Sequence, residues 1–131
     1  MEINIKTSKK DQIIDITNQI NQIVGDSELD EGLCTIFVKH TTCALTTADL
    51  DPGTDLDLLA FLRKISPSIT YKHPHDPSHA PDHLISSIIG PSINIPIKDS
   101  VLALGTWQKG ILVELNGPKE RKIEISLISA S

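Results

Sequence analysis

The sequence predicts one domain of mixed α and β structure, on the basis of its length, its hydrophobic periodicity and its turn residues. A chain of 131 residues suits a single domain, since two independent cores would each be close to the size at which small domains become marginal. Three segments carry apolar residues at helical spacing, and seven short runs are rich in Ile, Leu, Val and Thr. Because aromatic residues make up only 3% of a chain that is 39% hydrophobic, the core should be mainly aliphatic.

The first part of the chain predicts three strands and one helix. Residues 2–6 alternate polar and apolar side chains, which indicates a short strand. Residues 11–24 carry isoleucines at helical spacing and precede Gly25, so we expect an amphipathic helix with a glycine cap. Residues 33–39 predict a well-buried strand, and residues 43–47 a second short one.

The middle of the chain predicts two helices joined by a loop. Asp51 suits the N-cap and Pro52 the first turn of a helix that stops before the next proline, at residue 67. Residues 71–82 hold three prolines and most of the histidines, which favours a structured loop. Pro81 can open another helix, which would end at Gly90.

The last third of the chain predicts β structure. Residues 93–97, 101–107, 111–115 and 122–128 are β-rich runs separated by turn residues, and Asn116-Gly117 is the strongest turn signal. We expect these runs to form an antiparallel meander.

Charge and composition exclude several function classes. A net charge of -5 argues against binding to a nucleic-acid backbone, which needs a basic surface. No apolar run is long enough to cross a bilayer, and the N-terminus does not have the pattern of a signal peptide. We therefore expect a cytoplasmic protein with no nucleic-acid or membrane partner. Cys34 and Cys43 suggest buried free thiols.

Three groups of residues can carry chemistry. The first is His40-Thr41-Thr42, which follows a buried strand and offers hydroxyl groups and backbone donors to an anion. A structural histidine beside two β-forming threonines is the alternative.

The second group is the loop with His73, His75, His79 and His83, together with two aspartates. Neutral imidazole is a common ligand of zinc and similar metals, and a catalytic site needs about three protein ligands. The start of the helix near Pro81 would favour an anion instead. Metal binding, phosphate recognition and a merely solvated loop all remain open.

The third group surrounds the single tryptophan. Trp107 and Gln108 lie between two predicted strands, with Glu114 and Arg121 further along. A tryptophan packed at a hairpin end is the structural alternative. Glu114 and Arg121 would then be a cross-strand ion pair with only structural value.

In this order, the three groups resemble the YjbQ family, also called the secondary thiamine-phosphate synthase family, over nearly the whole chain. The residues that carry the resemblance form five blocks: His40-Thr41-Thr42 with Ala44-Leu45-Thr46-Thr47, Asp51-Pro52-Gly53, Ala80-Pro81-Asp82-His83-Leu84 with Gly90-Pro91-Ser92, Leu102-Ala103-Leu104-Gly105-Thr106-Trp107-Gln108, and Glu114-Leu115 with Gly117-Pro118-Lys119-Glu120-Arg121.

The resemblance implies a single domain over residues 1–131 with an α+β fold, a predominantly antiparallel β-sheet sandwich with about three helices, assembled as a homotrimer. It also implies a site for a small phosphorylated metabolite and a divalent metal ion, either zinc or magnesium or manganese. The expected residues fall into three sets: catalytic His40, Asp49, Gln108 and Glu114; substrate-binding or phosphate-binding Thr41, Thr42, Trp107 and Arg121; and metal-binding His40, His73 and His83. Whether His75 and His79 join the site stays open.

The activity implied by the resemblance is that of a thiamine-phosphate synthase-like transferase, which joins a pyrimidine methyl pyrophosphate to a thiazole phosphate. Two other functions use the same groups. One is a metal-dependent phosphoester hydrolase, and the other is a noncatalytic trimeric protein that binds a metal or a phosphorylated metabolite.

Overall fold

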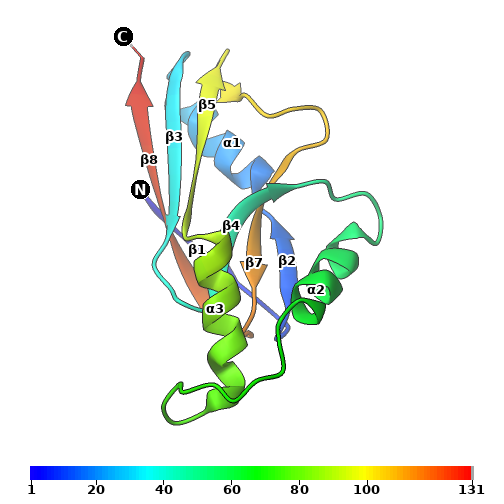
Figure 1. Cartoon of the computed structure of the whole chain (residues 1–131). Helices are drawn as coiled ribbons and strands as arrows, with labels where there is room; N and C mark the ends of the chain where they lie inside the picture. Colours follow the sequence, from blue (N-terminus) through cyan, green and yellow to red (C-terminus); the bar gives the residue numbers. More distant parts are fainter. Residues whose placement is uncertain (131) are drawn as a thin grey trace.

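The computed structural model describes residues 1–130, which form two antiparallel sheets and three α-helices (Figure 1). The elements in chain order are β1 (Glu2–Lys6), β2 (Gln12–Asp15), α1 (Thr17–Asp26), β3 (Gly32–Val38), β4 (Cys43–Ala48), α2 (Thr54–Lys64), the 3-10 turn η1 (Pro77–His79), α3 (Ala80–Ile89), β5 (Ser92–Lys98), β6 (Val101–Leu102), β7 (Lys109–Glu114) and β8 (Glu120–Ser129). The sheets have the strand orders β1-β8-β3-β5-β6 and β2-β7-β4. The expected α+β class with antiparallel sheets is confirmed.

The larger core lies between the two sheets and α1. Ile36 of β3 and Ile123 of β8 pack in one cluster with Leu45 of β4 and Leu112 of β7. Helix α1 adds Ile20, which is fully buried. This core is aliphatic, as the composition predicts.

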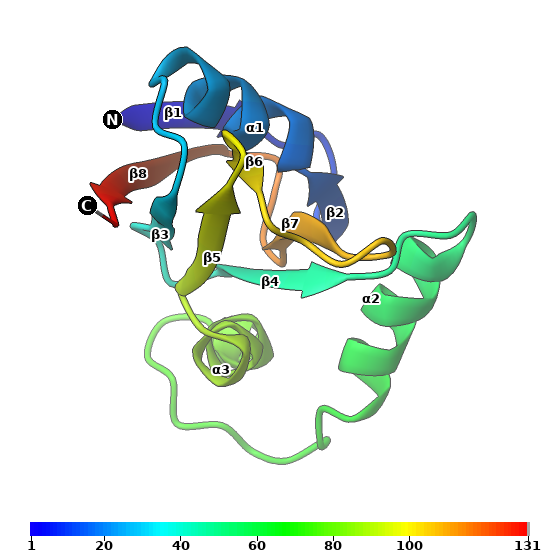
Figure 2. The same ribbon diagram turned by 90° about the horizontal axis from the view of Figure 1, so that it is seen from above.

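A smaller core covers the other face of the three-stranded sheet. Val113 and Leu115, within β7 and just after it, pack there with Leu62 of α2 and Ile85 of α3. Figure 2 shows α2 and α3 on one side of β4 and β7, with β8, β1 and α1 on the other. The run 111–115 is continuously apolar apart from Glu114 because the central strand of this sheet is buried on both faces.

The prediction of one helix over residues 11–24 is wrong in its first part. Residues Gln12–Asp15 form β2, in which Ile13 and Ile14 pair with Val113 and Leu112 of β7. Only the later isoleucines belong to α1, and Gly25 lies inside that helix and not at its end. Pairing with a strand about a hundred residues away therefore outweighs the local helical spacing.

The second helix begins later than predicted. Asp51 does not cap it. Instead, the carbonyl of Asp51 accepts a hydrogen bond from the amide of Thr54 at 2.8 Å, which closes a turn. Gly53 is the N-cap with φ of +90°, a conformation that a residue with a side chain rarely adopts. The third helix begins beside Pro81 and ends at Gly90, as predicted.

The predicted antiparallel meander is wrong. Strand β6 covers only Val101–Leu102 of the predicted run 101–107, and the following residues form a loop. Strands β7 and β8, on either side of Asn116-Gly117, belong to different sheets. That segment therefore connects two layers of the fold and is not a hairpin turn.

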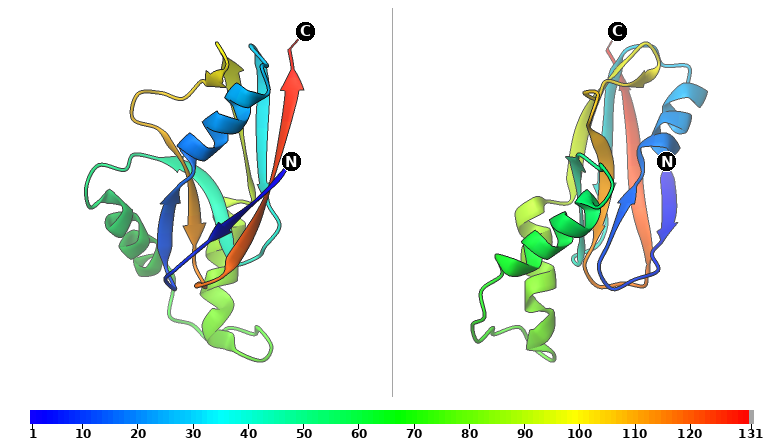
Figure 3. Two further views of the ribbon diagram at one scale, coloured as in Figure 1. Left: turned by 180° about the vertical axis from the view of Figure 1, so that it is seen from behind. Right: turned by 90° about the vertical axis from the view of Figure 1, so that its right-hand side faces the viewer.

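The segment between α2 and α3 projects beyond both sheets (Figure 3). It contains η1 and most of the chain's histidines, in agreement with the predicted structured loop. No helix among residues 1–130 combines the length and the hydrophobicity needed to cross a bilayer.

Candidate functional site

A buried ion pair joins the two sheets at the start of β4. Arg121 of β8 donates from Nε to Oε1 of Glu114 on β7 at 2.8 Å, and from Nη2 to Oε2. Nη2 also donates to the hydroxyl oxygen of Thr42 at 2.8 Å and to its carbonyl at 3.1 Å. The side chains of Glu114 and Arg121 are 0% and 2% exposed, so this contact fixes the residues that precede β4.

Both members of the pair stay charged at neutral pH. Burial alone would raise the pKa of Glu114, but hydrogen bonds from Arg121 and Thr7 hold that pKa below its ordinary value. Burial alone would lower the pKa of Arg121, but its hydrogen bond to Glu114 raises that pKa. The amides of Leu115 and Asn116 also donate to Glu114, at 3.0 and 3.1 Å.

His40 lies beside this pair with one ring nitrogen already engaged. Its Nε2 accepts a hydrogen bond from the amide of Lys122 at 2.9 Å. Burial, and then the positive charge of Arg121, lower the pKa of His40. The ring is therefore neutral at pH 7 and carries its proton on Nδ1, so it offers a hydrogen-bond donor and no free metal-binding lone pair.

A cleft of about 190 Å³ opens next to His40. Its other lining residues come from the start of β4 and from the second half of α3 with the turn that follows: Thr41, Cys43, Ser86, Ser87 and Pro91. The hydroxyls of Thr41 and Ser87 make no hydrogen bond to another residue in the described part of the chain, so both are available to a ligand. Burial raises the pKa of the Cys43 thiol to about 12, which keeps it protonated and unreactive.

The electrostatic surroundings of His40 are positive. Arg121, Lys119 and Lys122 all act to lower its pKa, and only Glu114 acts in the opposite direction. Because Arg121 is paired with Glu114, the excess positive charge near His40 comes from Lys119 and Lys122, on a chain whose net charge is -5. With hydroxyl groups and an imidazole N–H nearby, this cleft suits an anion.

The histidine loop forms a separate group on one side of α3. The ring centroids of His73 and His83 are 4.6 Å apart. His79 instead contacts Asp76, with 3.3 Å between Nε2 and Oδ2. Within residues 1–130 no three His, Cys, Asp or Glu side chains come together as a metal site, so His40, His73 and His83 do not form one within a single chain.

The start of α3 is poorly suited to an anion. The amide of Ala80 donates to the carbonyl of Pro77 in the preceding turn. Asp82 places a carboxylate in the first helical turn, where it is 1% exposed. The predicted anion site near Pro81 therefore gains no support from this geometry.

The remaining predicted residues lie at the far end of β4. Gln108 donates from Nε2 to the hydroxyl oxygen of Thr47 at 3.4 Å, and its Oε1 accepts from the amide of Gly105 at 2.8 Å. Asp49 accepts from the amide of Asp51 at 3.0 Å, and Trp107 is 71% exposed. Since β4 has six residues, this group lies roughly 17 Å from the residues at the start of the strand.

Sequence reasoning missed a second charged cluster, which links α2 to α3. Arg63 donates from Nη1 to Asp82 at 2.7 Å and from Nε to Asp11 at 2.9 Å. Lys10 also lies 3.3 Å from Asp82 and donates to the carbonyl of Leu115 at 2.8 Å. Of these residues only Asp82 lies in a motif block, and only the fold brings it together with Lys10, Asp11 and Arg63.

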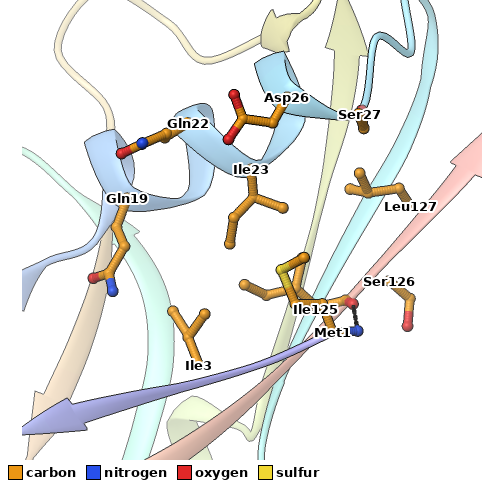
Figure 4. Close-up of a pocket in the computed structure, with 10 residues that line it drawn as sticks. All are labelled: Met1, Ile3, Gln19, Gln22, Ile23, Asp26, Ser27, Ile125, Ser126 and Leu127. Atoms are coloured by element: carbon orange, nitrogen blue, oxygen red, sulfur yellow. Dashed lines mark hydrogen bonds between the residues drawn. The ribbon is translucent and has the colours of Figure 1, made fainter.

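A groove beside α1 contains none of the predicted residues. It measures about 730 Å³ and lies between α1 and strands β1 and β8, with Ile3, Ile23 and Leu127 in its walls (Figure 4). The amino group of Met1 donates to the carbonyl of Ile125 at 2.8 Å at this groove. Its walls mix these apolar residues with polar ones such as Gln19, Gln22 and Ser126, and none of the residues expected to form the site lines it.

The fold and the cleft define a small α+β protein with a compact, positively surrounded polar site. A family model described as UPF0047 protein YjbQ-like matches residues 1–130, and the chain belongs to that family. A UPF0047 protein of Archaeoglobus fulgidus is 36% identical over 129 residues, which cover 98% of this chain and 100% of the relative.

Solved structures agree with the fold. A YbjQ-like protein of unknown function from Sulfolobus solfataricus has a TM-score of 0.91 and 34% identity, covering 98% of this chain and 95% of its own. An uncharacterized YjbQ/UPF0047 protein from Clostridium acetobutylicum has a TM-score of 0.89 and 38% identity, covering 98% and 99%. Both likenesses concern the family and the fold.

Proposed function

We propose that this protein binds a phosphorylated metabolite in the His40 cleft and acts there as a thiamine-phosphate synthase-like transferase. The observation that supports the proposal is the positive, donor-rich cleft on an acidic chain. Such a cleft suits the pyrophosphate of a pyrimidine methyl pyrophosphate, which would leave when the thiazole phosphate attacks.

The proposed reaction is a displacement at the methylene carbon. The thiazole nitrogen forms a bond to that carbon while the carbon–oxygen bond to pyrophosphate breaks, and the bonding electrons leave with the pyrophosphate. The Nδ1–H of His40 and the hydroxyls of Thr41 and Ser87 would stabilise the negative charge that develops on it. Arg121 and Glu114 would position Thr42, and through it this edge of the cleft.

A bound divalent metal and a homotrimer remain predictions. His73 and His83 would supply two nitrogen ligands to a zinc-like ion, fewer than the three protein ligands usual in a catalytic zinc site. His40 does not fit as a ligand in the geometry described. A metal would add positive charge near a phosphate, and we derive no catalytic step from it.

The first test measures pyrophosphate binding by calorimetry and thiamine phosphate formation with both substrates. Replacing His40 with Ala should weaken pyrophosphate binding and lower turnover by about a hundredfold, as expected for loss of one donor to a developing anion. The matched control is His75→Ala, since His75 is an exposed loop residue away from the cleft. Unchanged binding in the His40 variant would contradict the proposed site.

The same assay separates the two alternative functions. Release of inorganic phosphate without the thiazole substrate would indicate a hydrolase. Saturable pyrophosphate binding without turnover would indicate a noncatalytic binding protein, an alternative favoured by the small volume of about 190 Å³ within one chain.

A further inference from the structure

The lining of the His40 cleft offers hydrogen-bond donors that carry no charge. The imidazole N–H of His40 and the hydroxyls of Thr41 and Ser87 are neutral at pH 7. Arg121, the cation buried beside them, is neutralised by its ion pair with Glu114. These groups can hold one phosphate by hydrogen bonds, but they cannot balance the charge of a second phosphate next to it.

We propose that Lys119 and Lys122 form a second phosphate subsite at the rim of this cleft, so that the site selects a diphosphate over a monophosphate. The inference rests on the proposed function for its first phosphate position, and it adds the class of ligand and the residues that recognise it. Three features of the two lysines support it: the anchoring of their backbones, the freedom of their ammonium groups and the charge that they bring to the cleft.

The backbones of both lysines are anchored to the buried part of the site. The amide of Lys122 donates to Nε2 of His40 at 2.9 Å. The amide of Lys119 donates to the hydroxyl oxygen of Thr7 at 2.8 Å, and that hydroxyl lies 2.7 Å from Oε1 of Glu114, to which it donates. The two side chains therefore extend from fixed points, one beside the His40 ring and the other beside the buried ion pair.

The ammonium groups of the same two residues are free to bind a ligand. Both side chains are exposed, and neither Lys119 nor Lys122 forms a side-chain hydrogen bond or an ion pair within residues 1–130. Lys39, in contrast, is paired with Glu2 and Glu124. A lysine ammonium is a point charge with three donors on a flexible four-carbon stem, so it can turn toward a phosphate at the rim.

The charge of the two lysines acts on the cleft itself. Both act to lower the pKa of His40, and Lys119 also acts to lower that of Cys43, another residue of the lining. Glu120, which lies between them in the sequence, is directly opposite Lys6 in the β1–β8 register, so Lys6 offsets its charge. Two cations beside neutral donors match two adjacent phosphate groups better than a single one.

Calorimetric titration with inorganic pyrophosphate and with inorganic phosphate tests the subsite. The wild type should bind pyrophosphate at least about tenfold more tightly than phosphate. Replacing both Lys119 and Lys122 with Gln should weaken pyrophosphate binding about 25-fold, or about fivefold for each exposed charge contact, and phosphate binding less than about threefold. Replacing both with Arg, which keeps the charges, should preserve the preference. The matched control is Lys98→Gln, an exposed lysine at the opposite end of the larger sheet, which should change neither affinity.

The titration of His40 in the ligand-free protein provides a readout that does not depend on binding. Because both lysines act to lower the pKa of His40, NMR should show a higher pKa for this ring in the double Gln variant than in the wild type. An unchanged pKa would show that the charge of the lysines does not reach the cleft, and it would overturn the inference.

The outcomes separate the inference from the proposed function. Equal affinity of the wild type for phosphate and pyrophosphate, or an undiminished preference in the double Gln variant, would overturn the subsite and leave a single phosphate position at His40. If the wild type shows the expected preference but forms no thiamine phosphate, the subsite stands and the proposed transferase falls. If the wild type binds neither anion, both fall.

Discussion

Replacing Glu114 with Gln should remove a large part of the protein's stability. The carboxylate is 0% exposed, and its two oxygens accept hydrogen bonds from Arg121, Thr7 and the amides of Leu115 and Asn116. A glutamine amide has one oxygen, so its NH₂ group would face donors and leave the Arg121 cation buried without a counter-charge. Breaking a buried ion pair in this way costs about 3–5 kcal/mol.

Urea unfolding followed by circular dichroism measures this effect. With a slope of about 2 kcal/mol per molar urea, the midpoint should fall by roughly 2 M at a fixed protein concentration. The control is Glu120→Gln, an exposed residue at the start of β8, which should change the free energy of unfolding by less than about 0.5 kcal/mol. A loss below about 1 kcal/mol for the Glu114 variant would refute the reasoning.

The same pair predicts a pH dependence. Because the pKa of Glu114 is lower in the folded chain than in the unfolded chain, its stabilising contribution is complete above the ordinary carboxyl pKa of about 4.3. That contribution should disappear as pH falls from there through the folded pKa. The Glu114→Gln variant should lack this part of the acid transition, and an identical transition in both proteins would contradict the assignment.

Three further predictions concern the His40 ring, the α2–α3 cluster and the Trp107 loop. Because burial lowers its pKa, His40 should titrate below 6.5 in an NMR experiment, and titration at or above 6.5 would contradict this. The stability that the neutral ring contributes should be lost as pH falls from 6.5 through the folded pKa, and the His40→Asn variant should not show this loss. Asp82→Asn should lower the free energy of unfolding by about 3 kcal/mol in urea titrations, whereas the exposed control Asp26→Asn should change it by less than about 0.5 kcal/mol. Gln108→Ala should speed the fluorescence anisotropy decay of Trp107 and lower the free energy of unfolding by less than about 1.5 kcal/mol. An unchanged decay would show that Gln108 does not brace the loop.

Local patterns predicted most of the strands and the start and end of α3, since these depend on neighbouring residues. They failed over residues 11–24, where isoleucines at positions 13, 14, 16 and 20 fit both a helix and a strand followed by a helix. The choice depends on β7, whose strand is about a hundred residues away in the chain. Strand order is likewise a property of the whole fold, and the turn signal at Asn116-Gly117 did not indicate that the chain passes between sheets there.

The sequence predicted several residues of the candidate site, but not the contacts that these residues make in the fold. The sequence pointed to His40, but the bond that fixes its ring comes from Lys122, 82 residues further on. Glu114 and Arg121 are an ion pair, as the structural alternative supposed, but the pair joins two sheets and is fully buried. Metal binding by His40, His73 and His83 stays a prediction, since His73 contacts His83 but no third metal-binding side chain joins them within residues 1–130. The roles of Asp49 and Trp107 also stay predictions.

Strand β7 contributes to both apolar cores, with Leu112 facing one and Val113 facing the other. The two cores therefore cannot come apart separately without exposing one face of this strand. In native-state hydrogen exchange, the amides of β7 should be among the slowest, and they should exchange only through complete unfolding. The layers on either side of the His40 cleft would then form one cooperative unit, and the cleft would keep its shape for as long as the chain stays folded.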